Sequence, residues 1–284
     1  MMSTLVVLGG FFALTGAAAG LTEWRRRVKC DGPNVLAAGE PHDPTAATAL
    51  ARVDTIRLAR SWWLWAGAAG SVALALVEGR PAYPGALLVG WLHPLLIGLF
   101  IATHRVVGTA RGAGTEGVGD VAVDGRTQAV GQLVAAGTVA AAVGLVSVVA
   151  VLVALGAGGM FDTWHPSGLV LAQLVLAPLV MAGVAVAAAR WWPHPAAAFV
   201  TLITVFFSPF SWVLGLHYFE GRRASERFEI VSSATVASHN VFLVGFLLWG
   251  TGFALLRSDR RPAVRVVCGA GAVVMTAGLL ARAM

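Results

Sequence analysis

Charged residues are scarce in this sequence. Asp, Glu, Lys and Arg make up 12% of the 284 residues, about half of their share in soluble domains, whereas hydrophobic residues make up 57%. The apolar stretches between the charges run to about 20 residues, which is long enough to cross the hydrocarbon core of a bilayer. The longest polar stretch, about 40 residues, is too short to fold alone. The sequence therefore predicts an all-α integral membrane protein without a large soluble domain.

Motifs for nucleotide binding and catalysis are also missing. The chain contains no G-x-x-x-x-G-K-[ST], no H-E-x-x-H and no G-x-S-x-G. Its apolar stretches hold almost no ionisable residues, although proton- and ion-coupled transporters keep such groups at membrane depth. Its two cysteines, Cys30 and Cys268, are far apart and have neither metal-ligand nor disulfide spacing. We therefore expect neither an active site nor a bound cofactor in this chain, and we expect no ion-coupled transport.

The histidines leave one alternative open, because pairs of them are potential ligands of haem or a metal. No pair has the i, i+4 spacing of ligands on one helix, so we expect ordinary hydrogen-bonded residues. The five concerned are His93, His104, His165, His217 and His239.

About eight transmembrane helices are predicted from the hydrophobic runs. Tryptophans mark several edges, as expected at the headgroup level, since Trp62 opens the second run and Trp191 closes the fifth. The first run lacks a basic segment before it, so it is predicted to be a retained helix rather than a signal peptide. The runs cover residues 4–22, 61–78, 84–103, 129–156, 167–189, 195–216, 239–256 and 263–281.

Basic residues predict the topology. If the N-terminus lies outside, the inner loops 23–60, 104–128, 190–194 and 257–262, with the adjoining Arg265, hold 15 of the 20 Lys and Arg residues. The net charge of +6 is thereby explained without nucleic acid as a partner. We expect a multi-pass protein of the cell membrane with both termini outside.

A helix at the membrane surface is predicted before the second run. Within residues 46–60, the apolar side chains of Leu50, Val53 and Ile56 share one arc, and Arg57 and Arg60 lie at the end that meets the membrane. We expect the arc to face lipid or neighbouring spans.

The inner loop 104–128 is the other polar segment of note. It mixes acidic and basic side chains among glycines, which suits either a reversible docking surface or a solvated connection between helices. Its charged residues include Arg111, Glu116, Asp120, Asp124 and Arg126.

The order of these segments resembles the type-2 ABC exporter permeases. The stretch LARVDTIRLARSWWLW at 50–65 resembles the elbow helix that enters the first core span of that family. Residues 111–134 resemble the family's segment between its second and third helices. Gly114, Thr115 and Glu116 match its G-T-E opening, and Val123, Gly131 and Leu133 match later positions, whereas Ala122, Asp124, Gly117 and Gly119 depart from the usual Pro, Ser and leucines.

This resemblance implies a six-helix permease core at 46–257. An additional helix with a cytoplasmic linker at 1–45 would precede the core, and an additional helix at 258–284 would follow it. It further implies a transport subunit without its own ATPase site, coupled through the segment at 111–126 to a separate ABC ATPase subunit that binds ATP. Its membrane partner would be a second copy or a related permease.

Two alternatives remain from other functional classes. One is a membrane assembly or regulatory protein that transports nothing, and the other is a haem- or quinone-linked membrane subunit that uses the histidines.

Overall fold

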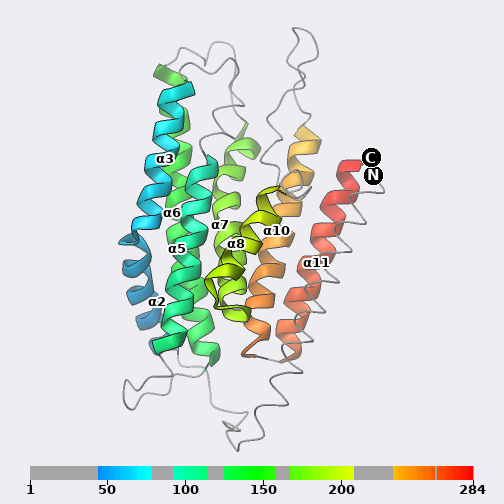
Figure 1. Ribbon diagram of the computed structural model, residues 1–284. Coiled ribbons are helices and arrows are strands. Elements are labelled where there is room, and N and C mark those ends of the chain that lie inside the picture. Colours follow the sequence, from blue (N-terminus) through cyan, green and yellow to red (C-terminus); the bar gives the residue numbers. More distant parts are fainter. Residues whose placement is uncertain are drawn as a thin grey trace, which may run out of the picture. The chain divides into compact units, whose positions relative to one another are not determined.

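The computed structural model describes residues 44–78, 92–113, 125–157, 167–207, 233–259 and 261–283. The chain divides into two compact units, Met1–Asp43 and Pro44–Met284, and all described residues belong to the second. This part of the chain is helical throughout, without strands (Figure 1). Its helices are α2 (Pro44–Ala59), α3 (Trp62–Glu78), α5 (Leu92–Ala113), α6 (Gly125–Ala157), α7 (Gly168–Trp191), α8 (Pro195–Phe207), α10 (Ser233–Leu256) and α11 (Pro262–Ala283).

Five of these helices are long and apolar enough to cross a membrane, which confirms a helical membrane protein. The five are α5, α6, α7, α10 and α11. By contrast, α3 has 17 residues and α8 has 13, and the predicted span at 4–22 lies outside the described residues. A total of eight spans therefore remains a prediction.

The helices bordering the predicted inner loop are longer than the hydrophobic runs indicated. The segment 104–128 was predicted as a loop, but α5 continues to Ala113 and α6 begins at Gly125. Residues 105–113 contain no proline to stop α5, and Val107 is buried in the core at 2% exposure. The contact of Val107 with the core thus accompanies the continuation of α5 beyond the apolar run.

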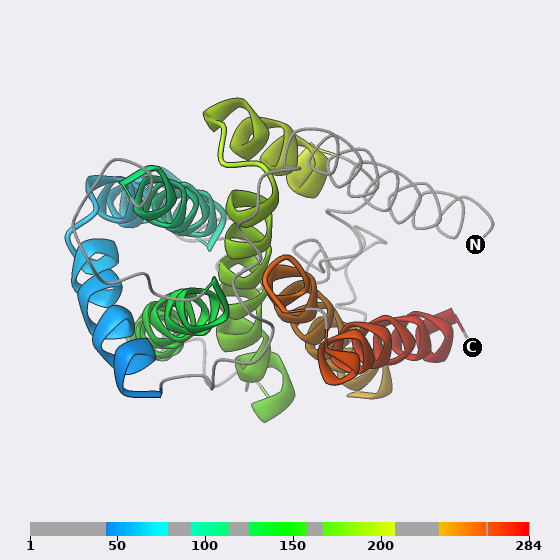
Figure 2. The same cartoon turned by 90° about the horizontal axis from the view of Figure 1, so that it is seen from below.

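Helix α7 lies at the centre of the second unit. Seen from below in Figure 2, it runs between α5 and α6 on one side and α10 and α11 on the other. About 61% of its span is buried, against 17% for α11, so most of the surface of α11 is exposed. Its alanine-rich second half packs in a core with side chains from α2, α3, α5, α6 and α10.

Close helix contacts depend on small residues. On α6, a Cβ at Gly131 would lie 3.0 Å from the Ala47 carbonyl oxygen and from Leu50 Cβ, so glycine permits α2 to pack there. A Cβ at Gly252 would lie 2.8 Å from the Cα of Cys268, and one at Gly271 would overlap the backbone of Trp249. Without glycine, α10 and α11 would have to separate.

Candidate functional site

The buried Arg190 joins three helices at one end of the bundle. It lies in the last turn of α7 and is 6% exposed. Its Nε donates to the Ala254 carbonyl of α10 at 3.1 Å, Nη1 to Gln132 Oε1 of α6 at 2.9 Å, and Nη2 to the Gly125 carbonyl at 3.1 Å. One side chain thereby fastens the start of α6 to the ends of α7 and α10.

One of the three acceptors of Arg190, the Ala254 carbonyl, is a carbonyl at the end of a helix. The last four carbonyls of an α-helix have no partner within the helix, and this end carries a partial negative charge. Ala254 lies in the last turn of α10, so Arg190 places its cation beside the C-terminal ends of both α7 and α10. A buried guanidinium requires such hydrogen bonds, since removing it from water is otherwise costly.

The ends of α7 and α10 also cap each other. Arg257 Nη1 donates to the Trp191 carbonyl at 2.9 Å, and Trp191 Nε1 donates to the Phe253 carbonyl at 2.9 Å. The rings of Trp191 and Phe253 stack with centroids 4.8 Å apart, and the Arg257 guanidinium carbon lies 5.7 Å from the Trp191 ring. From α5, His104 Nε2 donates to the Trp192 carbonyl at 3.2 Å. The ends of α7 and α10 therefore meet the middle of α5 at this point.

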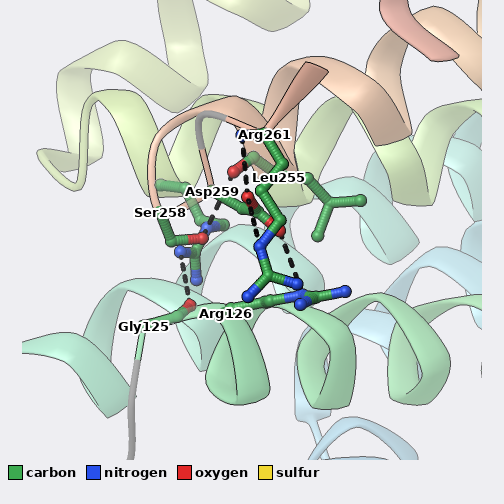
Figure 3. Close-up of polar contacts among 7 residues, drawn as sticks. Gly125, Arg126, Leu255, Ser258, Asp259 and Arg261 are labelled. Carbon is green, nitrogen blue, oxygen red and sulfur yellow. Dashed lines mark hydrogen bonds and ion pairs between the residues drawn. The ribbon is translucent and has the colours of Figure 1, made fainter. Parts of the chain in front are cut away.

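A buried carboxylate attaches the turn between α10 and α11 to α6. Asp259 is 6% exposed, and its Oδ2 lies 3.0 Å from Arg126 Nε (Figure 3). Its Oδ1 accepts from the Arg261 backbone N–H at 2.9 Å and lies 3.9 Å from Arg261 Nε. We call this set the arginine network; its members are Arg126, Gln132, Arg190, Trp191, Arg257 and Asp259.

The arginine network brings three chain connections to the same end. These are the segment between α5 and α6, the segment between α7 and α8, and the turn between α10 and α11. The same three connections were predicted as inner loops. Inner loops must share one side, because successive spans cross the membrane in opposite directions. The arginine network thus holds the ends of helices in place. Among the described residues, no group of three His, Cys, Asp or Glu side chains could hold a metal ion.

Of the segment predicted to couple to an ATPase, the structure describes only the two ends. Arg126 is the second residue of α6 and bonds Asp259, and Arg111 lies in the last turn of α5. The residues between these borders lie outside the described residues; they are Gly114, Thr115, Glu116, Asp120, Val123 and Asp124.

The predicted elbow segment is a helix, α2, and most of the predicted apolar arc lies off the face that packs against the bundle, which leaves the prediction that the arc faces lipid or neighbouring spans open. Val53 and Ile56 are exposed by 46% and 44%, Leu50 is partly buried, and Arg57 and Arg60 are exposed. The face that packs against the bundle consists of Ala47, Ala51, Asp54 and Leu58.

Asp54 is the unexpected member of that face. It is 6% exposed, and its Oδ1 lies 3.5 Å from Arg57 Nη1. Burial raises the pKa of its carboxyl above the usual range, and the Arg57 guanidinium opposes this shift only in part. The face of α2 that packs against the bundle thus contains a buried carboxyl group beside small, neutral side chains.

Sequence reasoning missed the role of Arg190 and of its partners. It assigned Arg190 to an inner loop as a determinant of topology, whereas α7 continues through this residue to Trp191. A single arginine after a long alanine-rich run was the available signal, but its acceptors lie 58 to 65 positions away along the chain. No pattern in the sequence around Arg190 identifies such distant partners.

No protein-family model, no curated protein and no solved structure matched this chain in the comparisons.

Proposed function

We propose that this chain is the membrane-spanning permease subunit of an ATP-driven ABC exporter. It forms the translocation path, and a separate ATPase subunit hydrolyses the nucleotide. A second copy or a related permease completes the membrane part. The proposal rests on the resemblance of residues 46–257 to such permeases, together with one structural observation, the attachment of the start of α6 to its neighbours.

That attachment supports a mechanism of force transmission. The predicted coupling segment lies between the end of α5 at Ala113 and the start of α6 at Gly125. Gly125 bonds Arg190 of α7, and Arg126 bonds Asp259 between α10 and α11. A partner that displaced this segment would therefore move α6 together with the ends of α7 and α10, rather than one helix alone.

The acidic residues of the segment provide the test. The variant Glu116→Lys, Asp120→Lys and Asp124→Lys, purified with its ATPase partner from native membranes, should lose ATP hydrolysis stimulated by the permease. Exposed ion pairs are individually weak, roughly 0–1 kcal/mol, so all three residues are changed together. Thermal unfolding of the variant should be measured alongside, so that a loss of stimulation can be distinguished from a loss of fold.

A matched control reverses three glutamates on the other side of the predicted membrane, namely Glu220, Glu226 and Glu229. This control should retain stimulated hydrolysis. Equal ATPase stimulation in both triple variants, or purification of the native complex without any ATPase, would contradict the proposed function.

A further inference from the structure

One exposed face of α2 combines three arginines with two branched apolar side chains. Arg52, Ile56 and Arg60 follow one another at four-residue intervals, and Val53 and Arg57 form the adjacent row. The Arg60 backbone N–H donates to the Ile56 carbonyl at 3.0 Å, so the helical spacing continues through Arg60. All five residues are exposed, Val53 and Ile56 by 46% and 44%. We call these five residues the basic face of α2.

All charged side chains of the basic face are positive. The single acidic residue of α2, Asp54, is 6% exposed and belongs to the face that packs against the bundle, where its Oδ1 lies 3.5 Å from Arg57 Nη1. Among the described residues, neither Arg52 nor Arg60 forms an ion pair. A guanidinium presents several N–H donors that match the oxygens of a phosphate. An anionic phosphate group therefore complements this face.

The start of α3 indicates the depth at which the basic face lies in a membrane. Trp62 and Trp65 are exposed by 60% and 65%, and indole rings prefer the boundary between headgroups and hydrocarbon. Trp65 Nε1 donates to the Ala59 carbonyl at 2.8 Å, which connects the first turn of α3 to the last turn of α2. The arginines are thereby held beside two tryptophans that are typical of the headgroup level.

Helix α2 lies at the edge of the bundle, at the end that carries the arginine network. In Figure 2, α6 lies between α2 and α7, and α2 packs on α6 near Gly131. Gly131 adjoins Gln132, which is a member of the arginine network. That end is predicted to face the cytoplasm, and the negative surface potential of the cytoplasmic leaflet attracts basic segments.

We propose that the basic face of α2 binds the headgroup of an anionic phospholipid. Arg52, Arg57 and Arg60 donate to the phosphate oxygens, while Val53 and Ile56 contact the upper part of the acyl chains. Helices at a membrane surface bind by this combination of buried apolar area and attraction to anionic lipids. A zwitterionic lipid supplies the same acyl chains but no net negative charge. This binding requires no ATPase and so goes beyond the proposed transport function.

The test compares an anionic and a zwitterionic lipid with the same acyl chains. The full-length protein in dodecyl maltoside is titrated with dioleoyl phosphatidylglycerol or with dioleoyl phosphatidylcholine, and native mass spectrometry measures the lipid retained. Phosphatidylglycerol should bind with an apparent Kd at least about tenfold lower. Ammonium acetate at about 1 M instead of about 0.15 M should remove most of this preference, because salt screens exposed charges.

Two matched variants locate the site. Arg52→Gln with Arg60→Gln removes two exposed charges and leaves Arg57 with its buried partner in place; the Kd for phosphatidylglycerol should rise about tenfold, with little change for phosphatidylcholine. The control, Arg261→Gln with Arg265→Gln, removes the same charge from exposed arginines near the start of α11. This control should keep the preference for phosphatidylglycerol.

Equal binding of the two lipids by the unaltered protein would overturn the proposal, and the basic face would then suit an acidic protein segment. An equal loss in the two double variants would also overturn it, because net charge rather than α2 would be responsible. Displacement of phosphatidylglycerol by inorganic phosphate at matched ionic strength would assign the face to a free anion instead. Unfolding of Arg52→Gln with Arg60→Gln would contradict the proposal as well, since the fold does not require side chains that serve only to bind lipid.

Discussion

Arg190 shows how a single residue can stabilise several helix ends at the edge of a membrane. Its planar guanidinium presents donors in a fixed fork, and here they reach acceptors on α6 and α10. Lysine has a point charge at the end of a flexible stem and cannot reproduce three diverging bonds. The arginine is therefore required for its geometry as well as for its charge.

Replacing this residue should destabilise the protein strongly. Arg190→Leu leaves Gln132 Oε1 and two carbonyls without their donor, and we expect a loss of about 3 kcal/mol or more of unfolding free energy. Arg190→Lys should recover only part of this loss. The exposed Arg105 on α5 offers a matched control, and Arg105→Leu should change stability by about 0.5 kcal/mol at most. Thermal unfolding in detergent micelles measures all three variants; similar midpoints for Arg190→Leu and Arg105→Leu would show that the network contributes little.

At the scale of helices, α10 and α11 form an antiparallel pair whose contact depends on backbone proximity. A Cβ at Gly245 on α10 would overlap the backbone of Met275, and a Cβ at Gly271 on α11 would overlap that of Trp249. The opposite face of α11 is open, and a Cβ at Gly269 would meet nothing within 4 Å. Since lipid is as apolar as leucine, close packing rather than hydrophobicity holds such helices together.

Two glycines on the same helix therefore make a direct comparison. Gly271→Val should force α11 away from α10 and lower stability by about 1–3 kcal/mol or more. Gly269→Val makes the same chemical change on the open face and should be nearly neutral. Thermal unfolding, together with crosslinking of cysteines placed across the α10–α11 contact, would measure the separation. If both variants behaved alike, the close contact between these helices would be disproved.

The lengths of the apolar runs and the packing between helices together explain which features could be predicted from the sequence. Helix positions followed from the length of apolar runs, and α3, α7 and α11 begin within a residue of the predicted edges. The buried face of α2 could not be inferred from hydrophobicity, because the bundle takes the small Ala47 and Ala51 and leaves Val53 exposed. The arginine network was also beyond prediction, since its hydrogen bonds join residues distant in sequence and depend on which helices become neighbours.

For the whole molecule, the arrangement of the helix ends predicts which connections lie on the same side of the membrane. The connection from α5 to α6 and the connection from α7 to α8 lie at one end of the bundle, since Arg190 bonds Gly125 and His104 bonds the Trp192 carbonyl. The start of α10 at Ser233 must then lie at the other end. The concentration of basic residues in these connections predicts that their end faces the cytoplasm.

Cysteine labelling tests the shared end and its orientation separately. In a chain with Cys30 and Cys268 replaced by Ala, single cysteines at Thr115 and His194 should resist a membrane-impermeant thiol reagent in intact cells and react after permeabilisation. A cysteine at Ser232 should react without permeabilisation. Because the first two positions belong to connections joined by the arginine network, they should always respond alike. Labelling of both from outside would reverse the predicted orientation and leave the bundle intact, whereas opposite responses at Thr115 and His194 would contradict the arrangement of the helices itself.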